Sequence, residues 1–208
     1  MPDEPLLTAS VHWSAFAPLL VTSLAIMGSP GPATISLTAS GAAFGVRRSA
    51  RYLAGIVAGT TVVLLAVAVG VTGALLATPA LRPVLIAAAA AYILYLAYHI
   101  ATAPPLGAGP DVAAAPTAAG GLLLGVANPK AWVAIGAVFV SVRVASDAVL
   151  DAGIKTAALT AMIVAINAAW LAAGASLAPV LRDPARARRA NVLLAAALVV
   201  STAAALVH

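Results

Sequence analysis

The sequence predicts an all-α integral membrane protein with six transmembrane helices, arranged as two inverted three-helix repeats. Of its 208 residues, 63% are hydrophobic and only 8% are charged, a balance that a soluble domain of this length does not need. The charged residues separate long uncharged segments, and a membrane-spanning helix needs ~20 consecutive apolar residues. Proline-containing sequences interrupt two of these segments at corresponding places in the two halves of the chain. We therefore expect the first and fourth helices to be broken.

The uncharged segments give six expected helices, at 12–44, 51–77, 82–101, 118–141, 154–180 and 189–207. The last is barely long enough to span, so five spans are an alternative in which it lies in the membrane interface. Residues 102–117 are rich in proline and glycine, as is typical of an irregular linker. We expect this linker to join repeat one (10–101) to repeat two (118–207) within a single transmembrane domain, 1–208.

The basic residues predict how the chain is oriented in the membrane. Seven of them fall between the first two or the last two expected helices: Arg47, Arg48, Arg51, Arg182, Arg186, Arg188 and Arg189. With six spans these two connections lie on one side, whereas the opposite side receives only Arg82, Arg143 and Lys155. Because basic loops stay in the cytoplasm, we expect both arginine-rich connections inside and both termini outside. This distribution explains the net charge of +5 without a nucleic-acid partner.

The first break is Pro30-Gly31-Pro32. Each proline lacks an N–H, so the carbonyls of Ile26 and Gly28 lose their helical donors. The helix that resumes afterwards has free N–H groups and the positive end of its dipole at this point. An anionic group such as a carboxylate can bind there. We expect all three residues of the break to line a substrate site.

The second break is Asn128-Pro129-Lys130, roughly 10 residues or ~15 Å into the fourth helix, near the midplane of a ~30 Å hydrocarbon core. A lysine there costs ~3 kcal/mol on insertion scales, so a functional role is expected. Lys130 can hold a carboxylate, titrate, cap carbonyls of the broken first helix, or extend to the cytoplasmic headgroups. Asn128 can cap the next half-helix as well as contact substrate. Paired breaks of this kind mark the substrate site of secondary transporters.

Five further side chains are candidate substrate ligands: Thr34, Ser36, Tyr92, Tyr95 and Asn167. Each has a structural alternative, because hydroxyls bond to their own helical turn and tyrosines form interfacial belts. An asparagine within a span can also bond to a neighbouring helix. The glycine pairs Gly41/Gly45, Gly55/Gly59 and Gly121/Gly125 indicate close helix packing, and such faces permit a homodimer.

Five segments in order, 29–32, 41–48, 53–59, 91–96 and 121–131, together resemble the lysine exporter (LysE/RhtB) family of amino-acid efflux transporters. They begin with Ser29-Pro30-Gly31-Pro32 and end with Val126-Ala127-Asn128-Pro129-Lys130-Ala131. The resemblance implies a multi-pass protein of the bacterial cytoplasmic (inner) membrane. It also implies export driven by a proton or membrane-potential gradient, with no ATP site and no cofactor.

The leading hypothesis is a secondary-active exporter of a small amino acid or amino-acid-like metabolite, with the lipid bilayer as its surroundings. A non-transporting scaffold or assembly subunit and a divalent-metal exporter are the alternatives. The chain has no cysteine, which excludes thiolate metal sites and a dithiol electron carrier. No carboxylate falls inside an expected span, and no nucleophile–base pair is evident, so we expect neither a metal site nor an enzyme.

Overall fold

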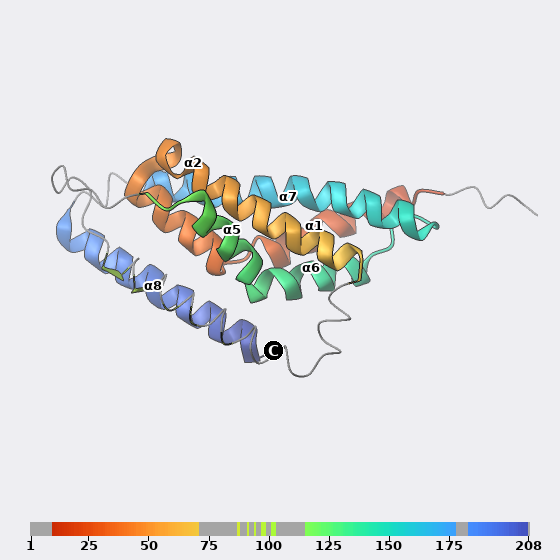
Figure 1. Cartoon of the computed structure of the whole chain (residues 1–208). Helices are drawn as coiled ribbons and strands as arrows, with labels where there is room; N and C mark the ends of the chain where they lie inside the picture. The colour runs from red at the N-terminus through yellow and green to blue at the C-terminus, as the bar shows by residue number, and fades with distance from the viewer. Residues whose placement is uncertain are drawn as a thin grey trace, which may run out of the picture.

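The fold is known from a computed structural model that describes residues 10–70, 115–177 and 183–207, with positions 87, 91, 94, 97, 98, 101 and 102. Every regular element in these residues is a helix, which confirms the all-α class. In chain order they are η1 (Trp13–Ala15), α1 (Phe16–Met27), α2 (Pro32–Ala68), α5 (Ala118–Ala127), α6 (Pro129–Ser141), α7 (Ala148–Ser176) and α8 (Pro184–Val207). Figure 1 shows them gathered into an elongated bundle.

Two of the described helices, α2 and α7, are long and apolar enough to cross a membrane. A third candidate span is the pair of α5 and α6, which is bent by 56° where the second break was expected. The expected helix at 82–101 and the linker at 102–117 lie mostly outside the described residues. Six spans, the inverted repeat and the single-domain boundaries therefore stay predictions.

Helix α2 folds back on itself at Gly45, whose φ of 74° lies in the left-handed region that favours glycine. Ser40 donates to the hydroxyl of Ser49 at 2.8 Å, and Ser36 bonds to the phenol of Tyr52. These contacts join a first arm, residues 32–44, to an antiparallel second arm, residues 46–68, and the ribbon reverses there in Figure 1. The expected end of the first helix near residue 44 is confirmed.

The second arm of α2 packs against α5 through glycines on both helices. A Cβ on Gly55 would lie 2.0 Å from the carbonyl oxygen of Ala118, and one on Gly121 would lie 2.3 Å from that of Tyr52. Gly59 and Gly125 face each other in the same seam, so both predicted pairs do allow close packing.

The first arm of α2 packs against α7 in the same way. A Cβ on Gly41 would lie 2.3 Å from the carbonyl oxygen of Leu171, and one on Gly174 would lie 2.0 Å from that of Thr38. The packing role expected for Gly45 is wrong, because a Cβ there would meet nothing within 4 Å. Gly45 serves the turn instead.

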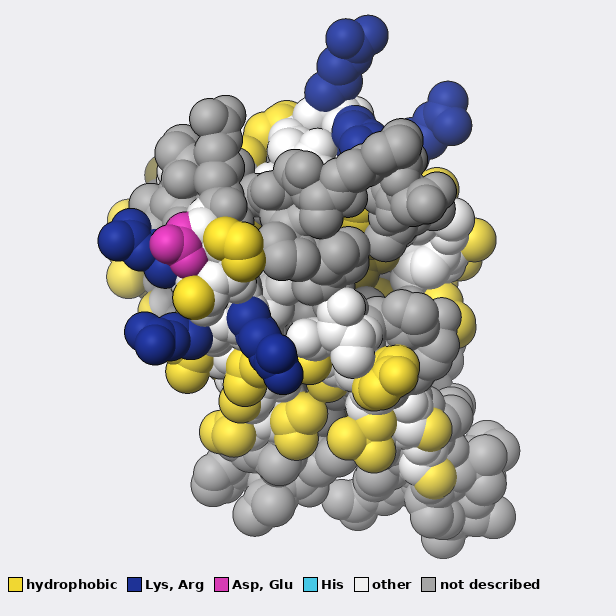
Figure 2. Space-filling view, turned by 90° about the vertical axis from the view of Figure 1, so that its left-hand side faces the viewer, with side chains coloured by type: hydrophobic (Ala, Val, Ile, Leu, Met, Phe, Trp, Pro, Cys, Tyr) yellow, Lys and Arg dark blue, Asp and Glu magenta, His cyan; other side chains and the backbone are white. Residues whose placement is uncertain are grey.

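One end of the bundle is basic. The reversal of α2 and the beginning of α8 lie together at the left of Figure 1, and Figure 2 shows dark-blue side chains spread over that end. The exposed arginines of these segments are Arg47, Arg48, Arg51, Arg186, Arg188 and Arg189. The described arginines of the two groups therefore lie at one end of the bundle, whereas the membrane side and the compartment that they face stay predictions.

At the opposite end, α7 begins at Ala148, six residues before the expected start. Asp147 caps it by accepting a hydrogen bond from the backbone N–H of Leu150 at 2.8 Å. This earlier start places Asp151 within the helix, one turn before Lys155. Asp151 lies in the first turn of this 29-residue helix, and the expectation that no carboxylate lies inside a span stays a prediction.

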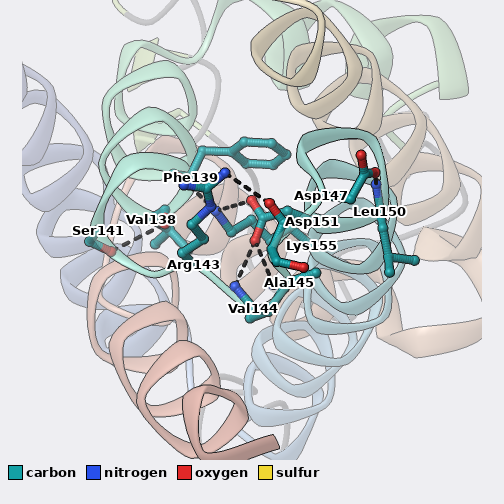
Figure 3. Close-up of polar contacts among 11 residues, drawn as sticks. Val138, Phe139, Ser141, Arg143, Val144, Ala145, Asp147, Leu150, Asp151 and Lys155 are labelled. Atoms are coloured by element: carbon teal, nitrogen blue, oxygen red, sulfur yellow. Dashed lines mark hydrogen bonds and ion pairs between the residues drawn. The ribbon is translucent and has the colours of Figure 1, made fainter. Parts of the chain in front are cut away.

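Asp151 and Lys155 tie α7 to the end of α6 (Figure 3). Lys155, which is 3% exposed, lies 2.7 Å from the Asp151 carboxylate and donates to the carbonyl of Phe139 at 2.8 Å. Asp151 also accepts hydrogen bonds from the backbone N–H groups of Val144 and Ala145, at 2.6 and 3.1 Å. One carboxylate thus satisfies a buried ammonium and two backbone donors.

Replacing the carboxylate should destabilise the protein more than replacing the lysine. Asp151→Ala leaves Lys155 buried without its counter-charge and frees two backbone donors, an effect of about 3–5 kcal/mol for a broken buried pair. Lys155→Met keeps the Asp151 bonds to Val144 and Ala145. Thermal unfolding in detergent checks the order of the midpoints, and the double variant should lose less than the sum of the two. Strict additivity would contradict this coupling.

Candidate functional site

The first break separates α1 from α2 and leaves carbonyls without helical donors, as the prolines predict. The carbonyl of Ile26 accepts a hydrogen bond from the hydroxyl of Ser29 at 2.8 Å. That of Gly28 accepts one from the indole N–H of Trp170 on α7 at 3.1 Å. Both carbonyls named from the sequence have thus found side-chain donors, which unwound backbone at membrane depth requires.

Lys130 supplies the donors for the next two carbonyls of the break. Its ammonium bonds to the carbonyl oxygen of Ser29, and it donates to that of Pro30 at 3.3 Å. The two breaks, 101 residues apart in sequence, are thereby tied together. Of the roles open to Lys130, capping the first break is the one that these contacts support.

The side chain of Lys130 passes close to Gly31, in space that a larger residue would occupy. A Cβ there would lie 2.5 Å from Cδ of Lys130 and 3.2 Å from Nζ. Gly31 has an extended backbone, with φ of −169°, and forms the N-cap of α2. Its N–H donates to the hydroxyl of Thr34 at 2.9 Å, and that hydroxyl donates back to the Gly31 carbonyl at 3.1 Å. Thr34 therefore closes the first turn of α2.

The second break is one residue, Asn128, between α5 and α6. Its side chain accepts a hydrogen bond from the backbone N–H of Lys130 at 3.2 Å, so it caps α6 as expected. Pro129 occupies the first helical position, where a missing N–H costs nothing. The indole of Trp132 donates to the carbonyl of Val126 at 2.8 Å, which satisfies an acceptor that the bend leaves open.

A cavity of about 40 Å³ lies between the two breaks. At roughly 10–15 Å³ for each water, it has room for about three water molecules. Its polar lining comes from α2, α6, α7 and the breaks themselves: Gly31, Thr34, Thr60, Asn128, Lys130 and Asn167. Met27 of α1 and Ala33 of α2 contribute to the apolar wall, and α6 and α7 supply the rest of it: Ala131, Ala134, Ile135, Ile163 and Ile166. Their spacing of three and four residues places each set on one helix face.

Five of the residues predicted from the sequence meet at this cavity: Gly31, Thr34, Asn128, Lys130 and Asn167. They come from segments far apart in the chain, and both breaks contribute. Substrate binding by these residues stays a prediction, but their convergence on one cavity is a property of the fold.

The remaining candidates lie elsewhere. Pro30 contributes its carbonyl to Lys130, Pro32 and Pro129 begin α2 and α6, and Ser36 is held by Tyr52. None of these four lines the cavity. Tyr92 and Tyr95 lie outside the described residues.

Thr60, on the second arm of α2, was missed. This residue lines the cavity and is buried. The sequence feature that could have indicated Thr60 is its position directly after Gly59. The packing of Gly59 against α5 fixes the rotation of this part of α2, and so the neighbours of the next residue. A threonine within a helix is usually bonded to its own turn, so the residue type alone did not single it out.

A sequence model of the LysE type translocators matches residues 24–208, from α1 to the end of the chain. The chain belongs to the LysE type translocator family. The resemblance noted from the ordered motifs is thereby confirmed, and it extends over α7 and α8, where the sequence offered only hydropathy and length. No curated protein and no solved structure matches this LysE type translocator. The family and the apolar helices indicate a multi-pass membrane transport protein.

Removing the ammonium of Lys130 should loosen the first break. In Lys130→Met, the carbonyls of Ser29 and Pro30 lose their donor. We expect faster hydrogen–deuterium exchange at Ile35, whose N–H bonds to the Gly31 carbonyl at 2.9 Å. Mass spectrometry of the protein in detergent measures this, with Arg47→Met, at an exposed arginine, as the matched control. Equal exchange in both variants would argue against the tie.

Proposed function

We propose that this LysE type translocator is a secondary-active exporter of a small amino acid or amino-acid-like metabolite. The observation that carries the proposal is the cavity between the breaks, which Lys130 lines while it bridges them. A single ammonium in an otherwise uncharged cavity attracts a carboxylate, and the hydroxyl and amide groups beside it can orient a small polar molecule.

The family and the arginines support an assignment to a bacterial cytoplasmic membrane. Arginine-rich connections at one end of the bundle favour the cytoplasm for that end. The Asp151–Lys155 end then faces outward, and the termini lie outside if the full chain has six spans. In this orientation the exported molecule enters from the arginine-rich end.

A divalent-metal exporter fits this lining less well. Hard divalent cations prefer carboxylate oxygens, whereas the cavity presents an ammonium, hydroxyls and amides. The positive charge of Lys130 opposes a cation further. A scaffold without transport would share the helices and the glycine seams, but it gives no reason for a polar cavity at the junction of two breaks.

Efflux from liposomes tests the proposed activity directly. Purified protein is reconstituted into liposomes loaded with radiolabelled L-alanine, and an imposed proton or potential gradient should drive efflux faster than from protein-free liposomes. Lys130→Met should lower the rate at least tenfold, because it removes the charge that attracts the carboxylate. A panel of L-alanine, L-serine, L-threonine and L-lysine that never exceeds the protein-free rate would refute the proposal.

Water access to the cavity separates a carrier from a scaffold. The chain has no cysteine, so single cysteines can be introduced without background. Ala134→Cys, on the cavity wall, should react with a small methanethiosulfonate reagent in membranes, whereas Val138→Cys, one turn along α6 and 0% exposed, should not. Labelling is read by mass spectrometry. Protection at both positions would favour the scaffold.

A further inference from the structure

Two residues that line the cavity each carry a buried polar atom without a hydrogen-bond partner among the described residues: Oγ1 of Thr60 and Oδ1 of Asn167. Their residues are only 7% and 6% exposed. Buried polar atoms are nearly always bonded, and an exception requires an explanation. Thr60 lies on the second arm of α2 and Asn167 on α7, so two separate helices bring such an atom to the same cavity.

The free atom of Asn167 is a hydrogen-bond acceptor. Its other terminal atom, Nδ2, donates to the carbonyl of Ile163 at 2.8 Å. A carbonyl only accepts, so the nitrogen must face Ile163 and the oxygen must face away from it. The oxygen therefore lacks a donor among the described residues, and an N–H or O–H of a molecule in the adjoining cavity can supply one.

Thr60 differs from two other helical threonines, Thr38 and Thr160. Thr38 and Thr160 donate to the carbonyls of Thr34 and Thr156, one turn back, at 2.9 and 2.7 Å, which is the usual arrangement. The hydroxyl of Thr60 makes no such bond. It remains free to accept a hydrogen bond beside Asn167 and to donate one in turn.

We infer that Thr60 and Asn167 form a second polar subsite that binds a donor group, an amine above all, of the molecule whose acidic group is attracted by Lys130. This rests on the proposed function and specifies the ligand further. Lys130 uses two of its three N–H groups on carbonyls, which leaves one for a carboxylate. The ligand then carries one acid and one donor, on a body small enough for a cavity of about 40 Å³.

The lining also argues against a second positive charge on the ligand. Lys130 is the charged residue of the cavity, and its other described walls are neutral. A zwitterion adds no net charge beside Lys130, whereas a dibasic amino acid brings a further cation with no carboxylate to pair with it. The subsite therefore selects small neutral amino acids over L-lysine and over acids that lack the amine.

Ligand-dependent thermal unfolding of the purified protein tests this subsite. The probes are L-alanine and propionate, which share a carbon skeleton and a carboxylate but differ in the amine, together with L-lysine. Midpoints measured against probe concentration give apparent Kd values. The wild-type protein should bind L-alanine more tightly than propionate and more tightly than L-lysine.

Substitutions that remove the acceptors should affect only the probe with the amine. Thr60→Val and Asn167→Leu keep the approximate side-chain size, and each should weaken L-alanine binding about tenfold or more while leaving propionate unchanged. Thr60→Ser, which restores the hydroxyl, should retain L-alanine binding. Thr160→Val is the matched control, because Thr160 bonds within its own turn outside the cavity.

The outcomes separate this inference from the proposed function. Equal losses of affinity for L-alanine and propionate would mean that Thr60 and Asn167 have structural roles only. This result would overturn the subsite but not the proposed export. Unchanged affinities in both variants would mean that water alone satisfies the two atoms, which also overturns it. L-lysine binding as tight as L-alanine would refute the charge argument. A wild-type protein that binds none of the probes and transports none of the panel would refute the proposed function itself.

Discussion

The bond between the ammonium of Lys130 and the carbonyls of Ser29 and Pro30 is the interaction on which the centre of this structure depends. Backbone that leaves the helical pattern within a membrane is tolerated only where its polar groups find partners. The first break frees several carbonyls in succession, and its own residues supply a single hydroxyl donor, from Ser29. Lys130 and Trp170 supply the others from α6 and α7. The first break therefore depends on donors from two helices that are distant in sequence.

The residue types made the two breaks predictable, but they did not predict that the breaks contact each other. Two prolines around Gly31 remove helical donors whatever the surroundings, and Asn128 before Pro129 is a helix cap by residue type. Lys130 was open to several roles, because the sequence does not reveal which element lies within reach of a long side chain. The packing of α2 on α5 and α7 decides this. Thr60 and Asn167 illustrate the same limit. Whether their polar atoms have a hydrogen-bond partner depends on helices that are distant in sequence.

The expected start of α7 was wrong because charged residues can also pair with each other inside a helix. Asp151 and Lys155 were treated as markers of a connection, which delayed the expected start of α7. They lie one turn apart on that helix, 2.7 Å from each other, and Asp147 caps it upstream. Gly45 was misjudged for the opposite reason, because its spacing from Gly41 matched a packing motif while its backbone makes the turn of α2. A spacing rule cannot distinguish a glycine that needs contact from one that needs a positive φ.

The double role of Lys130 places the first break and the cavity under one ammonium. Two of its N–H groups are used on the carbonyls of Ser29 and Pro30, and the third remains available for a carboxylate. Bonds of an ammonium to carbonyls and to a carboxylate are all charge-assisted, so each is stronger than a bond between neutral groups. A single lysine at the junction is therefore sufficient both to satisfy the unwound backbone and to attract an acid.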